Sequence, residues 1–204
     1  MRVNDVISNV NVYGINDAII GSKYPMSTNI EMLTDEVTKT VVALATSKHG
    51  EGHDNFLNGI IVQFDLTFTN KAWVEAERYH FLDFISSQST MHRMTKFDLD
   101  NAYINFVDPR VIEIMKEKVN AYNELLKNDP KNEKLKDMYM EILYTNPAGF
   151  KLTAKMTTNY RQLKTIYKQR RSHKLNEWQL FCDWCESLPH SEFICGIKRN
   201  STSV

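Results

Sequence analysis

The sequence lacks a long apolar run, a net charge and an abundance of cysteine. No stretch of its 204 residues approaches the ~20 apolar residues that a membrane-spanning helix needs. The N-terminal MRVNDVISNVNVYG has no apolar core of the kind found in signal peptides. The 25 basic residues balance the 25 acidic ones, so overall charge gives no reason to expect a nucleic acid or a membrane as partner. Three cysteines without an export signal favour reduced thiols and a cytoplasmic location.

Common site signatures are missing as well. There is no Walker loop and no GxGxxG, so any nucleotide would have to be held by side chains. The six histidines show no metal-ligand spacing. Cys182 and Cys185 lie one turn apart, but a metal site would need two more ligands. We therefore expect no metal, and we interpret this pair as semi-buried thiols beside Trp178 and Trp184.

The patterning that is present predicts an α+β fold in one domain, residues 1–190, followed by a tail, residues 191–204. Apolar and polar residues alternate over residues 60–70, which is typical of a strand with one wet face. A shorter strand is predicted over residues 10–14. Helices are predicted over residues 34–50, with Thr34 as the cap, 73–84, 109–127, 133–144, 157–171 and 175–187.

The basic run KQRRSHK, residues 168–174, contains one arginine that stands out. Arg170 is eleven residues after Asn159, so the two would point in nearly the same direction on one continuous helix. Leu163 and Ile166 lie between them on that face. A guanidinium on an apolar stripe needs a partner, because an unpaired buried charge is costly. A phosphate, a pyrimidine imide or a carboxylate from a neighbouring helix would each serve.

Three segments occur in an order that resembles one enzyme family. GHDNFLNGIIVQFDLTF, residues 52–68, is similar to a family stretch that begins GHES or GHET and ends FTF. TNYRQLKTIYKQRR, residues 158–171, resembles the family helix NxRxLxxFLxLR, and HKLNEW, residues 173–178, resembles its HAQW segment. The family is the flavin-dependent thymidylate synthases, and the resemblance covers roughly residues 50–185.

The resemblance implies a sheet of antiparallel type flanked by long helices, and a homotetramer with sites at subunit junctions. It implies FAD as cofactor and methylenetetrahydrofolate and NADPH as co-substrates, for methylation of dUMP at C5. The residues that it implies as flavin contacts are His53, Arg78, His80, Asn159 and Arg161. Those that it implies as nucleotide contacts are Gln88, Ser89, Arg93 and Arg170, with Arg170 also polarising the pyrimidine.

The segment YHFLDFISSQSTMH, residues 79–92, departs from the family signature RHRxxSxNxxSxRY. When the two are registered on Ser89, His80 matches as well. Tyr79, Phe81 and Met91 stand where the family has arginines. We therefore predict that two neighbouring arginines, Arg78 and Arg93, stand in for them.

Two functions follow. The first is an enzyme that transfers a one-carbon group to dUMP or a related pyrimidine nucleotide. The second is a homologue that binds a flavin or a nucleotide and has lost the chemistry, because several phosphate-binding charges are missing.

Overall fold

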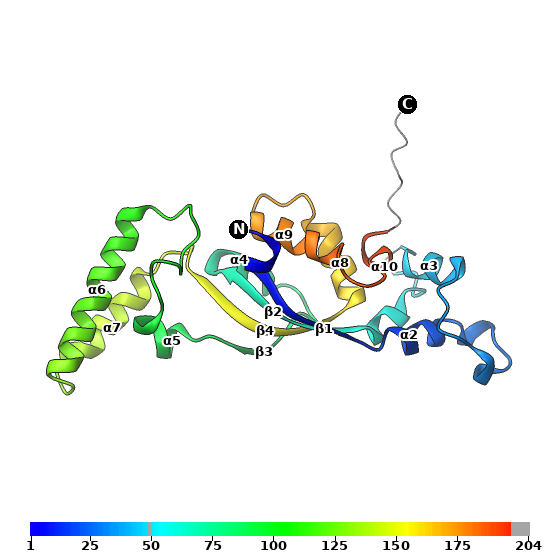
Figure 1. The fold of residues 1–204 in the computed structure, drawn as a ribbon, viewed down its shortest axis with the longest axis horizontal. Helices are drawn as coiled ribbons and strands as arrows, with labels where there is room; N and C mark the ends of the chain where they lie inside the picture. Colours follow the sequence, from blue (N-terminus) through cyan, green and yellow to red (C-terminus); the bar gives the residue numbers. More distant parts are fainter. Residues whose placement is uncertain (49, 197–204) are drawn as a thin grey trace, which may run out of the picture. The chain divides into compact units, whose positions relative to one another are not determined.

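The computed structural model describes residues 1–48 and 50–196, and it confirms the α+β fold class (Figure 1). Its centre is a four-stranded antiparallel sheet in the order β1-β2-β4-β3. The strands are β1 (Ile7–Tyr13), β2 (Ile61–Thr69), β3 (Asp83–Ser87) and β4 (Lys151–Asn159).

The described residues also form ten α-helices and four short 3-10 helices. The α-helices are α1 (Val3–Val6), α2 (Ile15–Ser22), α3 (Lys39–Ala45), α4 (Asn70–Ala76), α5 (Thr90–Arg93), α6 (Pro109–Asn128), α7 (Lys134–Thr145), α8 (Tyr160–Arg170), α9 (Asn176–Cys185) and α10 (Glu192–Cys195). The 3-10 helices are η1 (Tyr24–Met26), η2 (Ile30–Met32), η3 (Asn55–Gly59) and η4 (Met94–Lys96). No helix of the described chain is long and apolar enough to cross a membrane.

Several predicted elements are confirmed with the predicted physical cause. Strand β2 buries every second residue, and its side chains at positions 62, 64, 66 and 68 are fully buried. Helix α6 begins at Pro109, and Asp108 caps it by accepting a hydrogen bond from the Arg110 backbone N–H at 2.9 Å. Helices α7 and α9 also lie where the apolar spacing predicted them.

The helix predicted from residue 34 is shorter than expected, and Thr34 is not its cap. Helix α3 begins at Lys39, and Thr38 is the cap: its Oγ1 accepts from the Val41 backbone N–H at 3.3 Å. The Thr34 carbonyl instead accepts a hydrogen bond from Lys23 Nζ at 2.6 Å. The predicted strand at residues 10–14 is part of β1, which begins earlier, at Ile7, and pairs with β2.

The prediction of an aromatic helix over residues 73–84 is wrong beyond Ala76. The backbone of Phe81 has φ 62°, a left-handed conformation that a helix cannot continue through. The chain then enters β3, where all five residues are exposed. The helical spacing of Trp73, Phe81 and Phe84 therefore does not describe one face of one helix.

The helix predicted over residues 157–171 is also wrong at its start. Residues 151–159 form strand β4, in which Ala154, Met156 and Thr158 are buried at every second position. Asn159 has an extended backbone and caps α8, its Oδ1 accepting from the Gln162 backbone N–H at 2.9 Å. The helical rotation that related Asn159 to Arg170 therefore does not apply, since only Arg170 is inside the helix.

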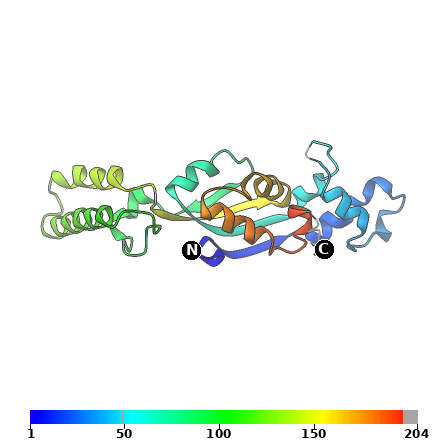
Figure 2. The same ribbon diagram turned by 90° about the horizontal axis from the view of Figure 1, so that it is seen from above.

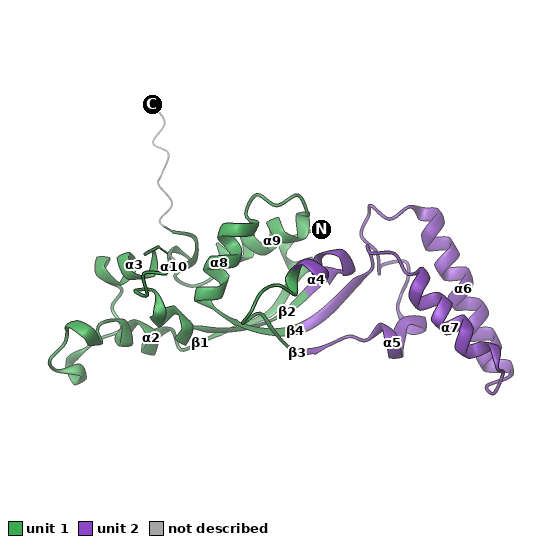
Figure 3. Ribbon diagram, turned by 180° about the vertical axis from the view of Figure 1, so that it is seen from behind, with its two compact units in different colours: residues 1–66, 76–85, 155–204 green, residues 67–75, 86–154 purple. Residues whose placement is uncertain are grey.

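The described chain divides into two compact units (Figure 3). Unit 1 comprises residues 1–66, 76–85 and 155 onward, and in it α8 and α9 cover one face of the strands (Figures 1 and 2). Unit 2 comprises residues 67–75 and 86–154, with α6 and α7 side by side. One domain over residues 1–190 stays a prediction. Part of the predicted tail forms α10, and residues 197–204 lie outside the described part.

Candidate functional site

In unit 1, a buried carboxylate joins the turn before η3 to helix α8. Asp54 is 1% exposed at its side chain, and its Oδ1 accepts from Arg161 Nε at 3.1 Å. Its Oδ2 accepts from Lys164 Nζ at 2.8 Å. Arg161 and Lys164 are three residues apart on α8, so both reach the same side of the helix. We name this group, Asp54 with Arg161 and Lys164, the Asp54 cluster.

One of the five residues expected to contact a flavin, Arg161, belongs to the Asp54 cluster, and two others, His53 and Asn159, lie within two residues of its members along the chain. His53 is exposed and directly precedes Asp54. Arg161 is 28% exposed, and its two Nη nitrogens have no partner among the described residues. Asn159 uses its Oδ1 as the cap of α8, so its Nδ2 amide is left as a donor. These groups form a set of hydrogen-bond donors suited to the carbonyl and phosphate oxygens of FAD.

The other two expected flavin residues lie on either side of a buried tyrosine. Arg78 and His80 are both exposed, while Tyr79 between them is 7% exposed. The Arg78 guanidinium carbon lies 5.8 Å from the centre of the Tyr79 ring. Since α4 ends at Ala76, neither residue is carried by a helix.

Arg170 is buried, as its place on the apolar stripe of α8 predicted, at 6% exposure. Its Nε donates to the Tyr79 hydroxyl at 2.7 Å, and Tyr79 in turn donates to Gln169 Oε1 at 3.0 Å. The guanidinium also lies 4.7 Å from the Trp178 ring centre and 5.4 Å from that of Tyr79. An internal hydroxyl and two rings therefore surround this arginine. Sequence analysis did not identify Tyr79 as its partner, because Tyr79 is 91 residues away.

The three remaining nucleotide candidates lie together in unit 2. The Gln88 backbone N–H donates to the Thr153 carbonyl, and Gln88 Oε1 accepts from the Thr153 N–H, both at 3.0 Å. Gln88 thus pairs with strand β4 through both its backbone and its side chain. Ser89 precedes α5 and makes no side-chain capping bond. Arg93 is exposed in the last turn of α5.

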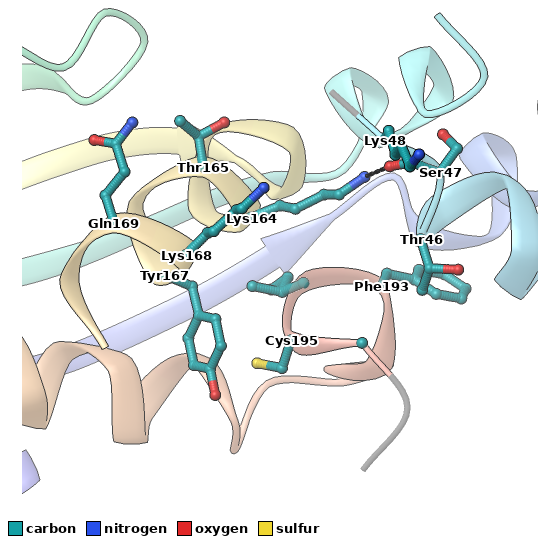
Figure 4. A pocket seen from close by; sticks show the side chains of 12 residues that line it. Thr46, Ser47, Lys48, Lys164, Thr165, Tyr167, Lys168, Gln169, Phe193 and Cys195 are labelled. Carbon is teal, nitrogen blue, oxygen red and sulfur yellow. Dashed lines mark hydrogen bonds between the residues drawn. The ribbon is translucent and has the colours of Figure 1, made fainter. Parts of the chain in front are cut away.

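A cavity of about 640 Å³ opens beside the Asp54 cluster, and sequence analysis did not find it (Figure 4). It lies between the end of α3, helix α8 and helix α10. Its lining residues are Thr46, Ser47, Lys48, Lys164, Thr165, Tyr167, Lys168, Gln169, Phe193, Ile194, Cys195 and Gly196. Three of these are lysines and none is acidic, although the whole chain is neutral. In the sequence, Lys48 is far from Lys164 and Lys168, so no local pattern marks the three lysines as one group.

The cysteines supply no reactive centre in helix α9. Cys182 and Cys185 are both fully buried, deeper than the semi-buried position that was predicted. Burial raises the pKa of the Cys182 thiol to about 12, and it raises the pKa of Cys185 well above its usual value. Within the described residues, no group of three or more histidine, cysteine, aspartate or glutamate side chains could hold a metal ion.

Comparison with known proteins gives a structural match only. No protein-family model matches the sequence, and no curated protein matches it at a significant level. The chain is similar to a structure of flavin-dependent thymidylate synthase ThyX from Helicobacter pylori complexed with FAD and dUMP, with a TM-score of 0.66 and 15% sequence identity. The match covers 93% of this chain and 97% of that one.

A second structure of Helicobacter pylori ThyX, also with FAD and dUMP, gives a TM-score of 0.65 at 16% identity, and covers 93% of this chain and 96% of that one. At this identity the likeness concerns the fold. The chain therefore has the fold of a flavin-dependent thymidylate synthase.

Proposed function

We propose that this chain binds FAD and a pyrimidine deoxynucleotide and catalyses one-carbon transfer to C5 of the nucleotide. Methylenetetrahydrofolate would be the carbon donor and NADPH the reductant, as the family resemblance implies. The observation that carries the proposal is the Asp54 cluster, in a chain whose fold matches ThyX over 93% of its length. Arg161 belongs to that cluster, and His53 and Asn159 lie beside its members along the chain, in family-like order.

The residues at this junction fit a flavin. His53, the Nδ2 of Asn159 and the Nη nitrogens of Arg161 are donors that would hold and orient it. Asp54 would fix the direction of the Arg161 guanidinium through its Nε, which leaves the outer edge for a ligand. When bound, FAD would supply the electron transfer that the reaction needs.

The nucleotide would be bound by Ser89, Gln88 and Arg93, with Arg170 polarising the pyrimidine ring. Ser89 and Arg93 have hydroxyl and guanidinium groups without a partner among the described residues. The Nε of Arg170 already donates to the Tyr79 hydroxyl. Arg78 would contribute the charge that Tyr79 and Phe81 do not carry.

We also propose a homo-oligomer, with a tetramer as the family-like form. Strand β3 is one of the two edge strands of the sheet, and its Phe84 and Ile85 are 55% and 51% exposed. Phe81, just before the strand, is 65% exposed. An exposed apolar edge strand is a surface that proteins normally cover, and a second copy of the chain would cover it.

A second candidate function is a binding protein of this fold that has lost the chemistry. The observation that favours it is the interior partner of Arg170, because the Tyr79 hydroxyl and the Trp178 ring already surround the guanidinium. Losing one charge-assisted phosphate contact costs about 1.5–3 kcal/mol. A chain that lacks several such contacts would bind dUMP weakly.

The visible absorption spectrum of the purified protein tests flavin binding. FAD gives absorbance near about 450 nm that is released on denaturation. We expect bound or readily absorbed FAD in the wild-type protein, and weaker uptake by His53→Ala. His92→Ala changes an exposed histidine at α5 and should take up FAD normally. A colourless protein that does not take up added FAD would leave only the second candidate, without a flavin.

Rescue of a thymidine-requiring bacterium tests the chemistry. If the chain makes thymidylate, its expression should restore growth without thymidine, and Arg93→Ala should abolish the rescue. Arg110→Ala removes an arginine of unit 2 whose side chain is 88% exposed, and it should leave rescue intact. A protein that binds FAD but fails to rescue would indicate another pyrimidine nucleotide as substrate. Rescue that survives loss of both Arg78 and Arg93 would contradict our assignment of the phosphate contacts.

A further inference from the structure

One ammonium group on helix α8 bonds three separate points of unit 1. Lys164 Nζ donates to the carbonyls of Ala45 and Ser47 at 2.7 Å each, and to Asp54 Oδ2 at 2.8 Å. Figure 4 shows the side chain extending from α8 toward Ser47. An ammonium has three hydrogens, so these bonds use all of its donors. We name Lys164 with these three acceptors the Lys164 clamp.

The acceptors of the Lys164 clamp lie at the two ends of one loop. Ala45 is the last residue of α3, where backbone carbonyls lack partners within the helix, and Ser47 follows it closely. A cation at this end of a helix is also favoured by the helix dipole. Asp54 lies at the other end of the loop, directly before η3. The Lys164 clamp therefore ties both ends of residues 45–54 to α8.

The loop between these ends depends on its anchors. Gly50 has φ 96° and Gly52 has φ 80°, both in the left-handed region that glycine adopts at no steric cost. A Cβ at Gly50 would meet no atom of the described chain within 4 Å, so packing does not hold the loop there. Since His53 directly precedes Asp54, its place relative to α8 is set by the bonds that Asp54 makes.

We propose that Lys164 is a positioning residue for the flavin site, which holds His53 in a fixed place relative to Arg161. Arg161 Nε binds one oxygen of Asp54 at 3.1 Å and Lys164 binds the other, so two bonds fix the carboxylate against α8. The family helix NxRxLxxFLxLR leaves position 164 open, so the resemblance assigns this lysine no role. The inference rests on the proposed function and adds to it a residue that acts through its neighbours.

Amide hydrogen exchange of the flavin-free protein tests the Lys164 clamp itself. Lys164→Met keeps an unbranched side chain and removes the ammonium. The Glu51 N–H donates to the Lys48 carbonyl at 3.2 Å, and the Asn55 N–H to that of Gly52 at 3.3 Å. A hydrogen bond to a charged group corresponds to roughly a tenfold or greater change in an equilibrium. We therefore expect these two amides to exchange about tenfold faster in Lys164→Met.

Lys155→Met is the matched control. Lys155 Nζ also binds one backbone carbonyl and one carboxylate, those of Asn9 at 3.2 Å and Asp65 at 3.3 Å, but it lies on β4. Its loss should leave the exchange of the loop amides unchanged.

Titration of the flavin-free variants with FAD, followed by absorbance near about 450 nm, tests what the Lys164 clamp does for the site. Coupled neighbours change an equilibrium by roughly 2-fold to 150-fold, and we expect Lys164→Met to weaken FAD binding about tenfold. If Lys164 acts through His53, this loss should disappear in the His53→Ala background. A purely structural lysine would cause the same loss in both backgrounds. Lys164→Arg, which keeps a cation beside Asp54, should recover most of the affinity.

Circular dichroism confirms that each variant is folded, and Lys164→Gln takes the place of Lys164→Met if the latter does not fold. Unchanged exchange of the loop amides would overturn the inference without any flavin. So would unchanged FAD affinity, or equal losses with and without His53, and each of these results would leave the proposed function intact. A wild-type protein that takes up no FAD would overturn the proposed function, and the role of Lys164 in it would fall as well.

Discussion

Replacing Asp54 by Asn tests how much the Asp54 cluster, which joins the turn after His53 to helix α8, contributes to stability. The substitution keeps the shape of the side chain and removes its charge. Asn offers one acceptor oxygen in place of two, and its amide group would point its hydrogens toward one of the two cations. Arg161 Nε and Lys164 Nζ, now at 3.1 Å and 2.8 Å from the two carboxylate oxygens, would therefore compete for one acceptor.

The expected loss of stability follows from burial. Removing one partner of a buried ion pair costs about 3–5 kcal/mol. The cations here are not fully buried, since the side chains of Arg161 and Lys164 are 28% and 18% exposed. Lys164 also keeps its bonds to the carbonyls of Ala45 and Ser47. We therefore expect Asp54→Asn to lower the free energy of unfolding by about 2–3 kcal/mol.

Urea unfolding followed by circular dichroism measures this change, and Asp183→Asn is the matched control. Asp183 accepts from Arg171 Nη1 at 2.6 Å, but the two side chains are 44% and 43% exposed. A surface pair of this kind contributes about 0–1 kcal/mol. Equal, small effects of the two substitutions would refute the reasoning, because they would mean that Asp54 is as well solvated in the folded protein as Asp183.

Three further predictions concern nucleotide binding, assembly and the thiols. In calorimetric titration, Arg170→Ala should weaken pyrimidine nucleotide binding far more than Arg171→Ala, because Arg171 is an exposed surface residue; equal effects would mean that the basic run acts only as a diffuse patch. Light scattering should show an oligomer at micromolar concentration, and Phe84→Ser should weaken it; a monomeric wild-type protein would contradict the proposed assembly. Iodoacetamide at pH 8 should modify Cys182 slowly until the protein unfolds, and rapid reaction of the folded protein would contradict its burial. Because burial raises the pKa of Cys182 from 9.0 to about 12, its contribution to stability is present below pH 9 and should be lost as the pH rises toward 12.

The sequence by itself determined the elements whose pattern is local. The alternation of apolar and polar residues gave strand β2, and Asp108 before Pro109 gave the start of α6. The buried position of Arg170 followed from the apolar residues three and four positions apart on α8. The order of the segments around His53 and Arg161 gave the fold family. In each case neighbours in the chain carry the information, because helix and strand periods are short.

The tertiary structure decided what depends on distant partners. Residues 83–87 and 157–159 lie in strands because they pair within one sheet, and this pairing overrides the helical spacing from which a helix was predicted there. Arg170 meets Tyr79 across 91 residues, and Asp54 meets Arg161 across 107. The cavity collects Lys48 and Lys168 from segments more than 100 positions apart in the printed sequence. A contact of this kind leaves no periodic trace in the chain, because it depends on how the elements pack and not on the residues beside it.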